Sequence, residues 1–134
     1  MVQRLFPITA FAMSLYCATA GLEALAAPPP LPSEALTAIH NVNVAAGHKD
    51  FAALEALMTP EFIWSYSGDA NAKQAIAEWQ SHPKFLKDLQ RITALPCVQK
   101  SALVECSANT KGGFRAGFKQ TAARWRMVYF VEGE

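Results

Sequence analysis

Apolar residues recur at helical spacing along the chain that follows residue 33. The first stripe includes Leu36, Ile39 and Ala46, and Gly47 is a residue type that often follows a helix. These positions predict a helix over residues 34–46. The apolar stripe expected to face the core contains Leu36 and Ile39.

A second helix and a strand are expected directly afterwards. Asp50 can cap the helix, an apolar stripe covers residues 51–58, and Pro60 ends it. Residues 62–66 are mostly bulky aromatic or branched types, which suit the pleated surface of a strand. The pattern therefore predicts a short helix followed by a strand.

Two more helices are predicted before the pattern changes. Asn71 with Gln74 resembles a capping box and opens a short helix that continues through Trp79. The apolar stripe that follows predicts a further helix over residues 83–94, with a proline in its first turn.

From residue 97 onward the apolar positions alternate as they do in strands. The alternation predicts strands over residues 97–99, 102–107, 114–120 and 125–132. Strict alternation in the last strand places Trp125, Met127, Tyr129 and Val131 on one face, opposite Arg126, Val128, Phe130 and Glu132. Neither face is polar, so both are expected to be covered in part. Helices followed by an antiparallel meander imply an α+β fold.

The N-terminus has the pattern of a secretory signal peptide. A positive start is followed by the apolar residues 5–22 and by small residues at Ala24 and Ala26, which predicts cleavage after Ala26. An uncleaved membrane anchor and a lipid on Cys17 are the alternatives. The cleavage site and the prolines after it favour removal, and Tyr16 is larger than lipoprotein processing requires before the cysteine.

The chain is therefore divided into a signal peptide (1–26), a proline-rich linker (27–33) and a single domain (34–134). The formal net charge is +1 and the basic residues form no stripe, which disfavours nucleic acid as a partner. No second apolar run approaches membrane length, so no membrane partner is expected after cleavage. The expected location is the periplasm or the medium.

The two cysteines of the domain are expected to form a disulfide. Cys97 and Cys106 are an even pair in an oxidising compartment, and they are the cysteines that remain once Cys17 is removed. A hairpin centred on Ser101 and Ala102 would place them opposite each other, and a looser bridge from loop to strand is equally allowed. The alternative is a metal site, but two cysteines without a nearby Cys or His partner make a poor zinc set. We expect no metal and no cofactor.

With these elements the chain resembles the NTF2-like superfamily, in its SnoaL-like group. The segment Asp50, Leu54, Leu57, Pro60 and Phe62 is similar to the D-x-x-x-L-x-x-L-x-x-P-x-F pattern common there. Residues 75–79 resemble the short third helix of that group, and the Trp-Arg start of residues 125–130 resembles its closing strand. The resemblance covers residues 33–79 and 114–134, and the segment between them departs from the family pattern.

The resemblance implies a cone in which a curved antiparallel sheet wraps the N-terminal helices. Members include isomerases, cyclases, dehydratases and transport factors, so the fold alone does not assign a function. In isomerase-like relatives an acid and a tyrosine at the mouth of the cone handle enolisation, which points to Asp69 and Tyr66 as catalytic candidates. A turn-forming role for Asp69 and a core role for Tyr66 are the alternatives.

Other residues are candidates for ligand binding. Arg115 and Lys119 share one face of their strand and could hold an anionic ligand, or they form the solvated side of a hairpin. The full set of ligand-binding candidates is Trp64, Tyr66, Trp79, Arg115 and Tyr129. For the tryptophans, core packing is the alternative. Structural or surface roles are expected for His40, His48 and His82.

Three hypotheses for function follow. No Ser/His/Asp signature, HExxH, CxxC or paired-carboxylate motif occurs. The hypothesis we favour is an exported, non-enzymatic domain that binds a small apolar ligand or a protein partner. The alternatives are a cone-pocket isomerase or hydratase and a structural module that forms a homodimer through its sheet.

Overall fold

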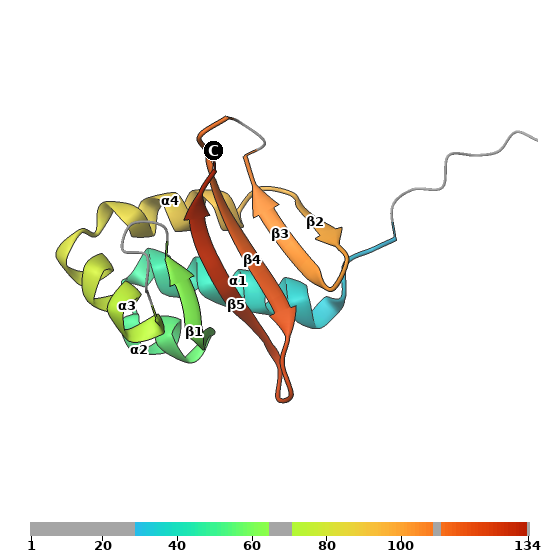
Figure 1. Cartoon of the computed structure of the whole chain (residues 1–134), viewed down its shortest axis with the longest axis horizontal. Helices are drawn as coiled ribbons and strands as arrows, with labels where there is room; N and C mark the ends of the chain where they lie inside the picture. Colours follow the sequence, from blue (N-terminus) through green and yellow to red (C-terminus); the bar gives the residue numbers. More distant parts are fainter. Residues whose placement is uncertain (1–28, 65–70, 109–110, 134) are drawn as a thin grey trace, which may run out of the picture.

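A computed structural model describes residues 29–64, 71–108 and 111–133 of the chain (Figure 1). Four helices and five strands follow in the order α1 (Ser33–His48), α2 (Phe51–Ala56), β1 (Met58–Trp64), α3 (Ala72–Ser81), α4 (Lys84–Thr93), β2 (Cys97–Lys100), β3 (Leu103–Ser107), β4 (Phe114–Gln120) and β5 (Trp125–Glu132). In this part of the chain no helix has the length and apolar character needed to cross a membrane. The signal peptide predicted for residues 1–26 and part of the linker lie outside the described residues.

The five strands form one curved sheet in the order β1-β5-β4-β3-β2. Neighbouring strands are antiparallel except for β1, which pairs in parallel with β5. The sheet is therefore mixed, whereas the sequence predicts an antiparallel one. Two helices and three strands separate β1 from β5, which gives the chain the crossover length that a parallel pair needs. The predicted α+β class, with N-terminal helices on a curved sheet, is confirmed.

The helices pack against one face of the sheet, which we call the inner face. Figure 1 shows α1 running across the long strands β4 and β5. The inner face buries Phe62 and Trp64 of β1, Val104 of β3, and Phe118 and Met127 of the β4–β5 hairpin. The opposite face, called the outer face below, includes Ile63, Val98, Glu105, Arg115 and Tyr129.

Side-chain caps fix the starts of α2 and α3 as the sequence predicts. The Asp50 carboxylate accepts a hydrogen bond from the Ala53 amide at 3.1 Å. The Asn71 side-chain oxygen accepts one from the Gln74 amide at 2.9 Å. Each cap satisfies an amide that has no partner inside its own helix, so a single residue determines where each helix begins.

The boundaries of α1 differ from the prediction. The helix continues to His48, and Lys49 rather than Gly47 takes the left-handed conformation that ends it, with φ of 52°. Leu36 is 49% exposed although its spacing predicts burial. The buried stripe is made largely of alanines, because small side chains let the helix lie close to the sheet; its members are Ala35, Ala38, Ile39, Val42, Ala45 and Ala46.

β1 begins earlier than predicted. The strand starts at Met58 and includes Thr59 and Pro60, although the sequence predicts that Met58 belongs to the helix before it. A proline favours extended backbone at the residue that precedes it, and strands at the edge of a sheet tolerate proline. β1 is such an edge strand, so Pro60 lies within it.

A β-bulge changes the faces of β5. The register passes from Phe118 opposite Met127 to Gly117 opposite Tyr129, so β5 holds one extra residue at Val128. The prediction of strict alternation is therefore wrong beyond Met127, because a bulge reverses the direction of the side chains that follow it. Phe130 is buried on the inner face, and Tyr129 lies on the outer face.

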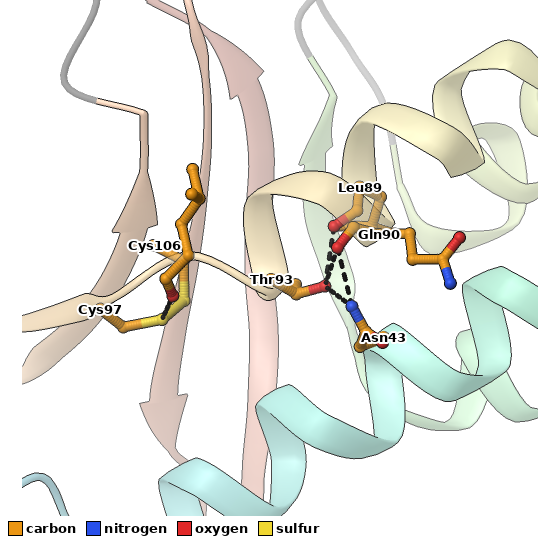
Figure 2. Close-up of a disulfide and its surroundings, with 7 residues drawn as sticks. Asn43, Leu89, Gln90, Thr93, Cys97 and Cys106 are labelled. Carbon is orange, nitrogen blue, oxygen red and sulfur yellow. Dashed lines mark hydrogen bonds between the residues drawn. A yellow bond between two sulfur atoms is a disulfide. The ribbon is translucent and has the colours of Figure 1, made fainter.

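The expected disulfide joins β2 to β3. Cys97 lies directly opposite Cys106 in the antiparallel register, with an S–S distance of 2.05 Å and a Cα–Cα distance of 4.2 Å (Figure 2). The hairpin turns at residues 101–102, so the cysteines occupy the opposed positions that the sequence allows, and the looser bridge is not found. Close by, the Asn43 amide of α1 donates to the Gln90 carbonyl at 2.7 Å and to Thr93 Oγ1 at 3.0 Å, which ties α1 to α4 (Figure 2).

Candidate binding surface

Aromatic rings fill the space between the helices and the inner face. Trp64 of β1 and Trp79 of α3 are buried, and their ring centroids lie 5.5 Å apart at nearly a right angle. Trp64 also packs edge-on to Phe85 at 4.8 Å and stacks on Phe130 at 5.4 Å. Such offset and edge-to-face pairs add to the free energy of burial. Trp64 and Trp79, two ligand-binding candidates, are therefore core residues of the domain.

A polar cluster lies on the outer face, where three strands meet. Glu105 of β3, Gly117 of β4 and Tyr129 of β5 follow one another in a single cross-strand row. The Tyr129 hydroxyl reaches across Gly117 and donates a short hydrogen bond to Glu105 Oε2. Lys100 Nζ contacts the other carboxylate oxygen, Glu105 Oε1, at 2.6 Å. Both carboxylate oxygens of Glu105 are thus occupied.

The cluster shifts the pKa values of its members in opposite directions. Burial by itself would raise the pKa of Glu105, but hydrogen bonds from Lys100 and Tyr129, with the charges of Lys100 and Arg115, hold it below its ordinary value. Burial raises the pKa of Tyr129, and the hydrogen bond to the Glu105 carboxylate and its charge raise it further. At neutral pH Glu105 is therefore ionised and Tyr129 is protonated.

This protonation pattern makes the cluster a poor acid–base centre. A general acid or base works best with a pKa near the working pH. The pKa of Glu105 lies below that range and the pKa of Tyr129 above it. Instead, Glu105 accepts fixed hydrogen bonds from Tyr129 and Lys100. We call the bonded pair the Glu105–Tyr129 frame; it holds the Tyr129 ring over Gly117.

Beside this frame the outer face has a shallow hollow of about 370 Å³. Its lining residues are Ile63, Glu105, Arg115, Tyr129 and Val131. The fold thus brings together Arg115 and Tyr129, both predicted as binding residues, with Glu105, which the sequence analysis does not single out. A signal for Glu105 was present: it is a lone acidic residue between Val104 and Cys106, within an otherwise apolar strand.

The remaining candidates do not join this cluster. Tyr66 and Asp69, the catalytic candidates, lie within residues 65–70, outside the described part of the chain. His40, His48 and His82 are exposed, and His82 Nδ1 contacts Glu78 Oε1 at 3.0 Å. Over the described ranges no group of three or more His, Cys, Asp or Glu side chains is arranged to hold a metal ion.

The outer face also exposes apolar side chains. Ile63 of β1 is 58% exposed and Val98 of β2 is 50% exposed, at opposite edges of the same cross-strand row. Val131 is half-buried between them. The face therefore has aliphatic side chains around the Glu105–Tyr129 frame, and its cations, including Arg115 and Lys119, lie on β2, β4 and β5.

Comparison with solved structures finds proteins of related shape. An NTF2-like protein with a cystatin-like fold from Novosphingobium aromaticivorans is 17% identical, with a TM-score of 0.44 over 75% of this chain and 79% of that one. An NTF2-like protein of unknown function from Pseudomonas putida KT2440 is 11% identical, with a TM-score of 0.47 over 72% and 81%. An LEH-like epoxide hydrolase from M. tuberculosis is 12% identical, with a TM-score of 0.46 over 78% and 84%.

Two of these three structures carry the NTF2-like description that the sequence predicts for this chain. At identities of 11% to 17% the matches bear on neither activity nor ligand. No protein-family model matches the chain, and no curated protein matches it either.

Proposed function

We propose that this chain is an exported, non-enzymatic domain that binds a different protein on the outer face of its sheet. The observation that carries this proposal is the contrast between the two faces. The inner face is filled by Trp64, Trp79 and their aromatic neighbours, while the outer face presents Ile63 and Val98 to solvent.

The filled interior favours a protein partner over a small apolar ligand. A ligand pocket encloses most of its ligand in a concave site. Here the buried rings of Trp64 and Trp79 occupy the space between the helices and the inner face. The hollow beside Tyr129 is shallow and lies on the sheet surface, which suits contact with a second protein surface.

The composition of the outer face also favours a protein partner. Ile63 and Val98 expose aliphatic side chains at the two edges of this face. Val131 and the Tyr129 ring lie on the strand next to Ile63, so a partner that spans the face would cover apolar surface along it. Tyr129 adds a rigid ring whose hydroxyl is already bonded to Glu105, so little side-chain entropy is lost when a partner covers it. With the bulge, the outer face of β5 carries Tyr129 and Val131 beside Arg126, so it is not wholly polar, which is consistent with a strand that is covered on both sides.

Two features support export. The N-terminal sequence has the charge, apolar run and small residues of a signal peptide. The domain also has a disulfide between Cys97 and Cys106, and such bonds persist in oxidising compartments.

Site-specific crosslinking in the native cells tests this proposal. A photoreactive p-benzoylphenylalanine replaces Ile63 on the outer face or, as a matched control, Val44, an apolar residue of α1 that is 40% exposed. We expect a single adduct from the Ile63 position that is absent from the Val44 position and disappears when Val98→Asp is added.

Three outcomes would contradict it. These are the absence of an adduct at position 63, the same adduct from both positions, and an adduct of twice the mass of the chain. The last outcome would establish the homodimer instead. Circular dichroism of each variant shows whether the fold is retained, and Val98→Lys replaces Val98→Asp if that variant does not fold.

A further inference from the structure

Four cations form a band at one end of the sheet, which we call the basic band: Lys73, Lys119, Arg124 and Arg126. Lys119 of β4 lies directly opposite Arg126 of β5 in the antiparallel register. Like charges at directly opposed positions destabilise a sheet. A negative charge supplied by another molecule would offset the repulsion between Lys119 and Arg126.

The band continues from the sheet into a hollow of about 540 Å³. This hollow lies where α2 ends and where β1 and α3 begin, and three of the cations line it together with one carboxylate, Glu55. Lys73 enters it from the first turn of α3, and Arg124 and Arg126 enter it from the β4–β5 hairpin and β5. The hollow is therefore surrounded by more positive than negative charge.

Arg126 has an unused donor at this hollow. Its Nε is buried and has no hydrogen-bond partner among the described residues. A buried donor without a partner costs roughly 1–3 kcal/mol. Arg124 differs, because its Nη2 donates to the Ala56 carbonyl at 2.8 Å and holds the hairpin against the end of α2.

Two cations elsewhere in the domain have carboxylate partners. Lys100 contacts Glu105 at 2.6 Å, and Arg91 contacts Asp88 at 3.0 Å. In the parts of the chain that the structure describes, none of the four cations of the basic band has such an ion pair. Three of them share one hollow with a single carboxylate, so positive charge is concentrated there although the net charge of the whole chain is only +1.

We propose that the partner is a protein that presents acidic side chains to the basic band while its apolar side chains cover Ile63 and Val98. This inference rests on the proposed function and specifies the chemistry of the partner. Complementary charge at the rim of an apolar contact selects the partner and speeds association. Carboxylates brought by the partner would compensate the repulsion between Lys119 and Arg126.

A second copy of the chain fits this surface poorly. The outer face of a copy offers mainly cations, Arg115, Lys119 and Arg126. Its buried carboxylate, Glu105, is already bonded to Lys100 and Tyr129, and β1 adds the single exposed carboxylate of Glu61. A nucleic acid also fits poorly, because unpaired bases stack on aromatic rings, whereas this face offers one such ring, Tyr129, between the aliphatic Ile63 and Val98.

Binding of a synthetic acidic polypeptide tests the inference. The purified protein is titrated into a fluorescently labelled random copolymer of glutamate and tyrosine at low ionic strength, and anisotropy is measured. We expect Lys73→Glu combined with Lys119→Glu to weaken binding by at least about tenfold. Glutamate at the start of α3 suits the helix dipole, so this variant should fold. The matched control is Lys84→Glu combined with Lys87→Glu on α4, which reverses the same number of charges and should bind as the unchanged protein does.

Three results would overturn the inference: equal binding of a lysine–tyrosine copolymer, equal loss in the Lys84→Glu, Lys87→Glu control, and tighter binding of a single-stranded DNA oligomer. Crosslinking at position 63 distinguishes failure of the inference about the basic band from failure of the proposed function. If the Ile63 adduct forms equally in the Lys73→Glu, Lys119→Glu variant, a partner exists but it does not use the basic band. If no adduct forms in either protein, the proposed function itself fails.

Discussion

Gly117 is the residue that allows the Glu105–Tyr129 frame to form. The three residues share one cross-strand row, and the Tyr129 ring lies over the Gly117 backbone on its way to the Glu105 carboxylate. A Cβ atom at position 117 would overlap the ring carbons of Tyr129. A glycine inside a strand often marks such a close approach. One missing side chain thus determines where the tyrosine lies.

Gly117→Ala is expected to lower the free energy of unfolding by roughly 1–3 kcal/mol, the usual cost of forcing atoms into a packed site. Chemical denaturation measures the change. A double-mutant cycle with Tyr129→Ala isolates the cause, because removing the ring removes the overlap. In the Tyr129→Ala background the same substitution should cost little or nothing. An equal cost in both backgrounds would place the strain in the backbone of β4.

The Glu105–Tyr129 bond also makes stability depend on pH. The pKa of Glu105 is lowered in the folded chain, so ionised Glu105 contributes stability above its unfolded pKa, and that stability is lost as the pH falls through the folded value. Tyr129→Phe removes one of the hydrogen bonds that lower this pKa. We expect a smaller acid-induced loss of stability in the variant than in the unchanged chain, because the folded pKa of Glu105 then lies closer to its unfolded value.

The same variant should lose roughly 1.5–3 kcal/mol at neutral pH, the usual contribution of a hydrogen bond to a charged group. The alkaline limb provides an independent check. Because the pKa of Tyr129 is raised on folding, its contribution is present below its unfolded pKa of about 10 and is lost above it. That alkaline decline should be smaller in Tyr129→Phe. Denaturation curves collected across the pH range would contradict the frame if both proteins behaved alike.

Among the elements, β2 depends most on a covalent bond. It is a four-residue edge strand with three exposed residues, and its register in the sheet is formed with β3 alone. Short edge strands have few contacts of their own and open easily. The Cys97–Cys106 bond links β2 to the buried strand β3, because Cys106 is fully buried on the inner face.

Reduction of this disulfide is expected to lower the free energy of unfolding by roughly 2–3 kcal/mol, since the bond closes a short loop in the unfolded chain. Denaturation with and without reductant measures the difference, and hydrogen exchange should rise first in β2. The Cys97→Ala, Cys106→Ala variant is the control, because its stability should not respond to reductant. Equal midpoints for the oxidised and reduced chain would show that β2 is held by other contacts.

At the scale of the whole molecule, features encoded by neighbouring residues were predictable and features set by distant ones were not. Asp50 and Asn71 cap helices through amides three residues away, and the hairpin of Cys97 and Cys106 is equally local. The bulge at Val128 and the parallel pairing of β1 with β5 depend on how separate strands meet. No periodicity within one strand contains that information.

The candidate surface was predictable only in part for the same reason. Arg115 and Tyr129 could be named from their strands, but strict alternation places Tyr129 on the same face as Met127. The bulge moves Tyr129 to the outer face, where it meets Glu105 across Gly117. Of the basic band, the sequence named Lys119 as a possible binding residue on its strand. The link of the band to Lys73 of α3 required the packed structure.

The pairing of β1 with β5 determines the order in which the domain can be completed. The sheet contacts of β1 are made with β5, as in the pairing of Trp64 with Phe130. While the chain is being synthesised, Trp64 therefore has no strand beside it until β5 has left the ribosome. Closing so long a loop is slow relative to local hairpin formation. A nascent chain of this kind completes its sheet late, and a chain that is still incompletely folded is what the proposed export would require.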